Sequence, residues 1–414
     1  MLKIKQILGE EIAGINDEHL MKLKERVEND HVTWVIGAGV SKSAGVPLWS
    51  ECLLKMWAQI LLLEKEKKED TKSEFQKALD KLKTSMAEPE EFLEKVNRTM
   101  KGDNSIGILS GVNTLEAAEY IQNFMTEILM DNSYYSDKLR DMEYADLVRN
   151  ALKPDKKPDE IFLKLKNEII GLLAKYFVQK IYDNKKIEVI SYNFDDLLEF
   201  ALEKEGLNKS DCHIKNPGTK NIIECETGIH IYHPHGTVSV LPTKFSKESE
   251  GLVLAEDSYE RLERKAYLWE NSIQAKALQS TSCIFLGFSG EDYNFRRIIK
   301  NMERGKERQQ IKHYLFMSIE SLVKRMFKNE IDRELLGNKA RTEEERKKYL
   351  ESIGKVEYDK ALEKLLNDSR MIYEKMLIIK KLEAQKMYWN SYNIIPIWTT
   401  RNELPQMVKK IVSG

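Results

Sequence analysis

The stretch VTWVIGAGVSKSAGVPLW, residues 32–49, decides the fold class of this chain. Its first part, residues 32–39, is a β-rich apolar run that ends in Gly37 and Gly39, a pattern typical of a buried strand leading into a tight turn. Helical periodicity follows at residues 49–65. Glycines between a strand and a helix let backbone N–H groups approach a phosphate. The stretch therefore predicts a strand–turn–helix unit with a phosphate-binding turn.

Five further strand signals follow, and helical patterns lie between most of them, which favours an α/β fold with a parallel sheet covered on both faces. The signals are IEVISYN (187–193), GIHIYHPHG (228–236), CIFLGFS (283–289), HYLFMSI (313–319) and YNIIPIW (392–398). We predict a Rossmann-like, doubly wound sheet. The whole chain, 1–414, is expected to be a single domain with helical insertions at about 66–175 and 320–386.

Bulk composition excludes several protein classes. Lysine and arginine number 66 and aspartate and glutamate 67, so no basic excess favours direct nucleic-acid binding. No apolar run approaches the ~18 residues that span a bilayer, and Glu10 and Glu11 interrupt the apolar start, so we expect neither membrane segment nor signal peptide. The scattered cysteines favour a cytoplasmic location. They are Cys52, Cys212, Cys225 and Cys283, and no two of them have CxxC spacing.

The glycine turn does not follow the usual nucleotide-binding spacings. Gly45 comes six residues after Gly39, whereas the common dinucleotide motif has a spacing of three. No Gly-Lys-Ser/Thr follows, so the turn is not a Walker loop. Without further context, the alternative is a purely structural tight turn.

A polar cluster, SYNFDDLLE (191–199), follows the second strand signal. Ligands of parallel sheets sit at the carboxyl ends of strands, so Asn193 and Asp195 are candidates for substrate contact. The alternative is helix capping, in which Asp195 or Asp196 accepts hydrogen bonds at the start of the next helix.

Three histidines, His230, His233 and His235, lie within GIHIYHPHG. Their number raises the question of a metal, but no cysteine or carboxylate joins them locally, and we predict none. His235 is the favoured functional histidine, because it precedes Gly236 at a strand end and imidazole suits a general base. A satisfied structural histidine is the alternative.

The fourth cluster, GFSGEDYNFR (287–296), follows the strand signal CIFL. Gly287 and Ser289 are its candidate ligand-binding residues. A turn followed by a capped helix is the alternative, and it assigns Asp292 and Arg296 to the helix start and to packing, although Arg296 could approach a phosphate.

Taken together, GAGVS with the later Gly-Val-Pro, YNFDD, His-Gly and GFS resemble the signatures of the sirtuin superfamily. They look most like the bacterial sirtuin-like (Sir2-type) NADases of anti-phage defence. The resemblance implies an NAD+ site with Asn193 and His235 as catalytic residues. It implies that cofactor contacts come from Gly37, Ala38, Gly39, Ser41, Pro47, Asp195, Gly287 and Ser289.

Departures from the deacylating sirtuins favour hydrolysis of NAD+ to nicotinamide and ADP-ribose. Leu48-Trp49 replaces an acidic residue and a Phe-Arg pair, Tyr192 replaces a common glutamine, and paired CxxC zinc motifs are missing. The chain resembles stand-alone subunits that work with a separate HerA-type ATPase, so we expect a homo-oligomer and that partner. The alternatives are an NAD+-dependent protein deacylase and a non-catalytic subunit that binds NAD+ or ADP-ribose.

Overall fold

A computed structural model describes residues 17–63, 114–130, 143–154, 156–217, 225–246, 252–264, 268–303, 311–319, 372–400 and 403–413. The predicted insertions at 66–175 and 320–386 lie partly outside these residues, and the parts of them that are described are helical. Across the described ranges, no helix combines the length and apolarity that crossing a bilayer requires.

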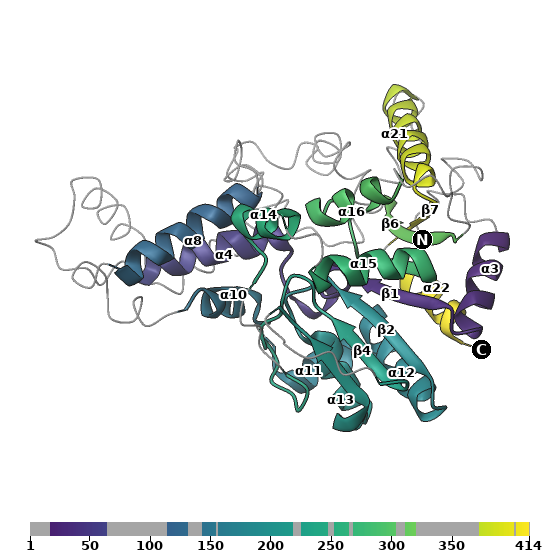
Figure 1. The fold of residues 1–414 in the computed structure, drawn as a ribbon, viewed down its shortest axis with the longest axis horizontal. Helices are drawn as coiled ribbons and strands as arrows, with labels where there is room; N and C mark the ends of the chain where they lie inside the picture. The colour runs from purple at the N-terminus through teal and green to yellow at the C-terminus, as the bar shows by residue number, and fades with distance from the viewer. Residues whose placement is uncertain are drawn as a thin grey trace, which may run out of the picture. The chain divides into compact units, whose positions relative to one another are not determined.

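The strands form a seven-stranded sheet in the order β3-β4-β2-β1-β5-β6-β7, with helices around it (Figure 1). The pairs β2–β4, β3–β4, β5–β6 and β6–β7 are parallel. From β1 the strands run outward as β5, β6, β7 on one side and as β2, β4, β3 on the other, so the chain winds in both directions from β1. Ligands of doubly wound sheets bind where the order reverses. The predicted Rossmann-like α/β fold is confirmed.

The chain divides into two compact units, each built from separate stretches of sequence. The first comprises residues 1–35, 275–289 and 299–414, and the second comprises residues 36–274 and 290–298. Elements of the first unit are α3 (Asp17–Glu28), β1 (Val32–Ile36, whose last residue belongs to the second), β5 (Ser282–Leu286), β6 (His313–Ser318), α21 (Ile372–Ser391), β7 (Ile394–Thr399) and α22 (Glu403–Val412).

The second unit holds the remaining elements. They are the 3-10 turns η1 (Ala38–Val40) and η2 (Lys42–Ala44), α4 (Trp49–Leu63), α8 (Thr114–Met130), α10 (Tyr144–Leu152), α11 (Pro158–Leu165), α12 (Ile169–Tyr182), β2 (Lys186–Ser191), α13 (Leu197–Lys204), η5 (Lys209–Asp211), β3 (Cys212–Lys215), β4 (Gly228–Tyr232) and α14 (Glu256–Arg264). Two further helices contribute residues to both units, α15 (Trp269–Ser280) and α16 (Tyr293–Glu303).

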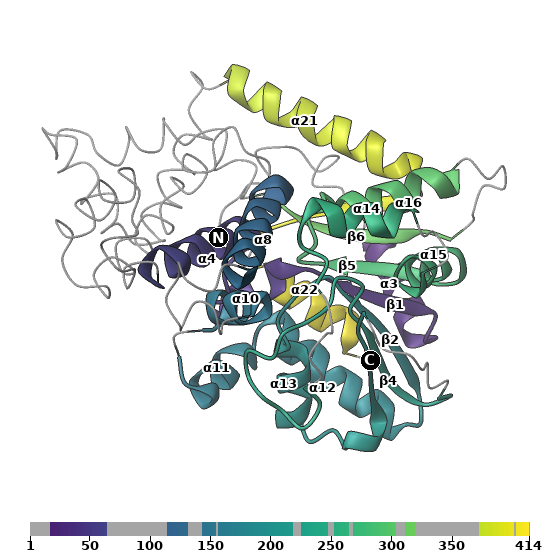
Figure 2. The same cartoon turned by 60° about the vertical axis from the view of Figure 1, so that its left-hand side comes forward.

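Apolar faces position the helices of the second unit. The helix α12 buries most of its length, including Leu173 and Phe177, and packs along β2 and β4 and against α13. Figure 2 shows α4 and α8 side by side, and α10 also packs against α4. Burial of these apolar side chains holds α13, the helix that follows Asn193 and Asp195, against α12.

Three helix-to-strand connections use the same local device. Asp30, Asn184 and Asn393 follow α3, α12 and α21 and have φ of 57°, 57° and 59°. Aspartate and asparagine tolerate this left-handed conformation better than other non-glycine residues, so they end a helix and redirect the chain. Each connection leads directly into a strand, β1, β2 or β7.

The six predicted strands are confirmed, with shorter bounds. The strand β3, with sequence CHIK, was not predicted, because four residues of which only two are fully buried give little periodicity. It pairs with β4 at the edge of the sheet.

Candidate functional site

Backbone hydrogen bonds hold the carboxyl ends of several strands of the second unit together. The amide of Tyr192, just after β2, donates to the carbonyl of Ile36 at the end of β1. The amide of His233, just after β4, donates to the carbonyl of Lys215 at the end of β3. Three of the predicted site segments, at 37–41, 191–199 and 233–236, therefore start from neighbouring strand ends.

The predicted strand–turn–helix unit is confirmed, with β1 ending at Ile36 and α4 beginning at Trp49. Two 3-10 turns, η1 and η2, separate β1 from α4, and the amides of Val40 and Ser41 donate to the carbonyls of Gly37 and Ala38. The turn is therefore not the N-terminus of an α-helix. Gly45 closes η2 with φ of 95°, a left-handed conformation that glycine adopts without strain.

Within this turn Gly37 is buried and Gly39 is exposed, so the backbone of the turn reaches the surface beside a buried Ser41. Pro47 is buried in the segment that leads into α4. Trp49, the first residue of α4, packs its ring 5.6 Å from the ring of Phe194.

Ser41 connects the first and second predicted segments. Asn193 Nδ2 donates to Ser41 Oγ over 2.9 Å, and Ser41 Oγ donates to Asp195 Oδ1 over 3.0 Å. All three side chains are at least 96% buried. Asn193 Oδ1 is also buried, and no group of the described residues hydrogen-bonds to it. The link therefore leaves this oxygen available as a hydrogen-bond acceptor.

The two aspartates after β2, Asp195 and Asp196, accept hydrogen bonds from different parts of the chain. Asp195 Oδ1 accepts from the amide of Leu197 as well as from Ser41. Asp195 is therefore both a helix cap and a member of the buried link, so the two interpretations of this cluster are not exclusive. Burial raises the pKa of the Asp195 carboxyl to about 7. A group with this pKa can both donate and accept hydrogen bonds near neutral pH.

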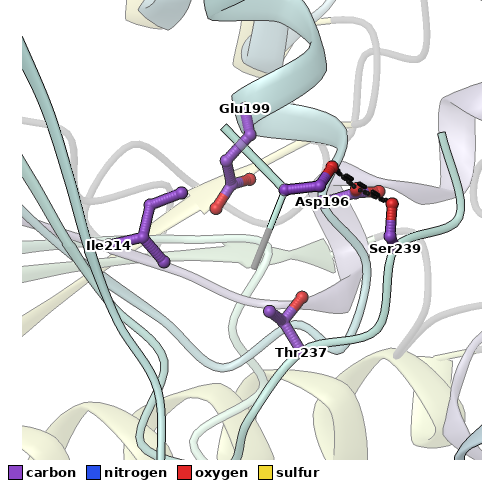
Figure 3. A pocket seen from close by; sticks show the side chains of 6 residues that line it. Asp196, Glu199, Ile214, Thr237 and Ser239 are labelled. Atoms are coloured by element: carbon purple, nitrogen blue, oxygen red, sulfur yellow. Dashed lines mark hydrogen bonds between the residues drawn. The ribbon is translucent and has the colours of Figure 1, made fainter. Parts of the chain in front are cut away.

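Asp196 instead holds the loop that follows the His-Gly pair. Its carboxylate accepts hydrogen bonds from the amides of Val240 and Leu241 and from the hydroxyls of Ser239 and Ser246. Figure 3 shows Ser239 joined to Asp196, with the Glu199 carboxyl nearby at the start of α13.

The pocket in Figure 3 is lined by Asp196, Glu199, Ile214, Thr237, Ser239 and Ser246. Its cavity volume is about 0 Å³, far below the roughly 300–1,000 Å³ of small-molecule sites. It is therefore part of the packing that supports the site and not a place for a dinucleotide.

His233 forms a buried pair with Glu199. Its Nε2 lies 2.7 Å from Glu199 Oε1, with both side chains at most 2% exposed, and its Nδ1 lies 3.4 Å from the carbonyl oxygen of Asn193. Burial lowers the pKa of His233, but the charge and hydrogen bond of Glu199 outweigh it and raise the pKa above its ordinary value. The pair anchors the backbone of Asn193, a role that no sequence pattern signalled.

His235 occupies an aromatic enclosure. The rings of Tyr192 and Tyr259 approach it edge-on at 5.1 and 5.3 Å, and the ring of Phe194 stacks at 6.3 Å. His235 Nε2 lies 3.4 Å from Asp292 Oδ2. Burial lowers the pKa of His235, and the Asp292 carboxylate offsets part of that effect. At neutral pH the ring is therefore uncharged and can accept a proton.

Backbone geometry explains the glycine after this histidine. Gly236 has φ of 86°, and its amide donates to the carbonyl of His233 to close a turn. The left-handed conformation strains any residue with a Cβ. The amide of Val253 then donates to the carbonyl of His235, so the main chain fixes His235 from both sides of the loop.

Two predicted residues, Gly287 and Ser289, belong to the first unit. Gly287 follows β5 with φ of 62°, and Ser289 is exposed two residues later. In the second unit, Asp292 Oδ1 accepts from the amide of Phe295 at the start of α16, and Arg296 Nε donates to the carbonyl of Gly290. Both residues therefore have the helix-start and packing roles expected of them.

His230 does not join the other two histidines. It lies within β4, opposite Glu188 of β2 and His213 of β3, and its ring is 4.8 Å from that of His213. Among the described residues, no three His, Cys, Asp or Glu side chains form a group that could hold a metal ion.

The second unit thus presents a parallel α/β site in which a buried Asn-Ser-Asp link and an uncharged histidine follow neighbouring strands. The profile of a family described as "SIR2-like domain" matches residues 187–344. This match supports a Sir2-type family, whose members are generally NAD-dependent enzymes. The matched residues contain Asn193, Asp195 and His235, while the glycine turn precedes them. No curated protein matched the chain.

Proposed function

We propose that this protein is an NAD+ glycohydrolase that cleaves NAD+ to nicotinamide and ADP-ribose. The observation that carries the proposal is the Ser41 link, which joins a turn residue to Asn193 and Asp195 across more than 150 residues of sequence. The SIR2-like match at 187–344 supports NAD+ as the substrate.

The groups of the site suit the nicotinamide riboside end of NAD+. Asn193 presents a buried carbonyl oxygen that none of the described groups satisfies, and such an acceptor suits a hydroxyl or a water. Asp195, whose burial raises its pKa to about 7, can accept from the carboxamide N–H₂ or, when protonated, donate to its oxygen. The turn Gly37–Ser41 is the candidate contact for the pyrophosphate.

Hydrolysis breaks the bond between ribose C1′ and the nicotinamide nitrogen, and the bond electrons neutralise the positive charge of the pyridinium ring. Water supplies the oxygen that bonds to C1′, and one proton is released. Asn193 would orient that water, and His235 would accept the proton from it or from a ribose hydroxyl. An imidazole that stays uncharged at neutral pH suits this role.

The test is to incubate purified protein with NAD+ and to quantify nicotinamide and ADP-ribose. Asn193→Ala and His235→Ala should each lower the rate about 100-fold or more, because general-base and positioning groups contribute on that scale. His230→Gln is the matched control, since His230 is a buried histidine of the same segment that lies outside the link and the aromatic enclosure.

Other outcomes of this test would contradict the proposed activity or the assignment of His235. Release of nicotinamide only when an acylated peptide is present would replace the hydrolase by a protein deacylase. Binding of NAD+ by calorimetry without product, under all conditions tried, would indicate a non-catalytic binding subunit. Equal loss of activity in His230→Gln would contradict the assignment of His235.

The cellular role that we propose is depletion of NAD+ in anti-phage defence, within a cytoplasmic homo-oligomer that acts with a HerA-type ATPase. This part rests on the resemblance of the motifs alone. Cells that express the wild-type chain with that partner should resist phage and lose NAD+ on infection, whereas cells with His235→Ala should do neither.

A further inference from the structure

Asp292 sits between the histidine of the candidate site and a tyrosine of α14. Its Oδ2 lies 3.4 Å from His235 Nε2 and accepts a hydrogen bond of 3.0 Å from the hydroxyl of Tyr259. Its Oδ1 accepts the amide of Phe295 over 2.7 Å at the start of α16. Each carboxylate oxygen is thus held by a different element, and the carboxylate cannot turn without losing a hydrogen bond.

We propose that Asp292 is a positioning residue, whose carboxylate keeps the proton of the neutral His235 ring on Nε2 and thereby makes Nδ1 the basic nitrogen. This inference rests on the proposed function for its catalytic meaning. A carboxylate can only accept hydrogen bonds, so the nitrogen that faces it must carry the proton. The 3.4 Å separation is long for a hydrogen bond, and such contacts shorten when substrate binds.

Among the described residues, Asp292 is the charged side chain whose effect on His235 is resolved. Tyr192, Tyr259 and Phe194 supply the other ring contacts. Burial and the neighbouring Asp292 raise the pKa of Tyr259 well above its ordinary value, so this phenol stays protonated as a donor. The carboxylate is also the charge that opposes the lowering of the His235 pKa by burial.

The competing explanation is that Asp292 only caps α16. Asp292→Asn separates the two roles, because asparagine is as good a cap as aspartate. With Oδ1 still on the Phe295 amide, the side-chain NH₂ takes the place of Oδ2 and donates to His235 Nε2. That arrangement favours the tautomer with the proton on Nδ1. Asp292→Ser is a second capping variant, whose shorter side chain does not reach the histidine.

The experiment is NMR of the full chain labelled with ¹⁵N and ¹³C in histidine, with the His235 signals assigned by their loss in His235→Gln. We expect the Nε2–H tautomer in the wild type and a shift toward Nδ1–H in Asp292→Asn. In both Asp292→Asn and Asp292→Ser, titration of His235 should move to lower pH. An unchanged tautomer and unchanged titration in both variants would overturn the proposal.

Kinetics provide the second readout. Asp292→Asn should lower kcat for NAD+ hydrolysis at least about tenfold with little change in KM, because a wrong tautomer removes the base and leaves binding intact. Activity equal to that of the wild type would contradict the positioning role. If the wild type releases no nicotinamide, the proposed hydrolase fails, while the tautomer and titration still decide whether Asp292 positions His235.

A third variant covers the case in which the Asp292 variants do not fold. Tyr259→Phe keeps the ring beside His235 and removes only the hydroxyl that holds Asp292 Oδ2. It should move the titration of His235 to lower pH and lower kcat, each by less than the Asp292 variants do. No shift in this variant, measured on folded protein, would contradict the proposed chain from Tyr259 through Asp292 to His235.

Discussion

Ser41 Oγ donates a hydrogen bond to Asp195 Oδ1 over 3.0 Å, although the two residues are 154 positions apart in the sequence. The same hydroxyl oxygen accepts from Asn193 Nδ2. One serine therefore fixes the side chains of both residues assigned to the nicotinamide end of the substrate. Because the three groups are buried, the link leaves them little freedom to reorient.

Replacing this serine should impair the chemistry more than the fold. Ser41→Ala removes the donor to Asp195 and the acceptor of Asn193, and we expect NAD+ hydrolysis to fall about 10- to 100-fold, since small misplacements of positioning groups cost that much. Ser43→Ala is the matched control, because Ser43 is a buried serine of the same turn whose hydroxyl donates to the carbonyl of Val40. Equal nicotinamide release from wild type and Ser41→Ala would contradict the role of the link.

Asp195 should make the protein less stable at alkaline pH. Its pKa rises from 3.8 to about 7 on folding, so the folded chain binds more protons between these values and the free energy of unfolding falls as pH rises through them. Asp195→Asn removes the buried charge and should stabilise the protein by on the order of a few kcal/mol at pH 8, and by less at pH 5. Urea unfolding at both pH values measures this.

The exposed Asp183→Asn provides the control for that measurement. His233 also makes the free energy of unfolding fall as pH rises, because its pKa is raised in the folded chain. Stability from the His233–Glu199 pair is present below the unfolded pKa near 6.5 and is lost as pH rises through the higher folded value. An Asp195→Asn gain that is larger at pH 5 than at pH 8 would show that this carboxyl is ionised at low cost.

The buried His233–Glu199 pair should be costly to break from one side. Glu199→Ala or His233→Ala leaves a buried partner unsatisfied, and each should lower the free energy of unfolding by about 3–5 kcal/mol. The double variant should lower the free energy of unfolding by much less than the sum of the two single variants. A strictly additive result in urea unfolding would mean that the two side chains do not interact.

An exposed ion pair between α13, the helix of Glu199, and α11 gives the reference for this cycle. Lys204 Nζ lies 3.0 Å from Asp159 Oδ1, with side chains 36% and 88% exposed. Solvent screens such a pair, and its coupling should stay below about 1 kcal/mol. The difference between the two cycles isolates the effect of burial.

The sequence predicted the sheet because its strands are short apolar runs that end in glycine or polar residues, as in VTWVIGAG and IEVISYN. It did not predict β3, which is four residues long and has only two buried residues. It predicted a tight turn between β1 and α4, but not that two 3-10 turns would form it. The reason is that GVSKSAGV carries turn residues whose local hydrogen bonds depend on the packing of Ser41 and Val40.

The site could be predicted only where residues stand at strand ends. Asn193, Asp195 and His235 follow predicted strands, and the structure places all three in one unit. Glu199 and Tyr259 lie within helices, where a single polar residue is indistinguishable from a solvated one. Asp292 was assigned to capping, which is correct for one of its oxygens, while the other faces a histidine 57 positions earlier, a contact that no local pattern encodes.

Trp49 should contribute to activity through the aromatic rings that enclose His235. Its ring lies 5.6 Å from Phe194, which stacks on His235 at 6.3 Å. Trp49→Ala removes the support of Phe194 and should lower kcat several-fold, whereas Trp49→Phe keeps an aromatic contact and should retain most activity. Trp57→Ala is the control for general destabilisation. Trp57 lies in α4 like Trp49, and its ring makes a similar tilted contact with Phe124 of α8. If Trp49→Ala and Trp57→Ala lower nicotinamide release equally, Trp49 acts through the stability of α4 and not through the histidine.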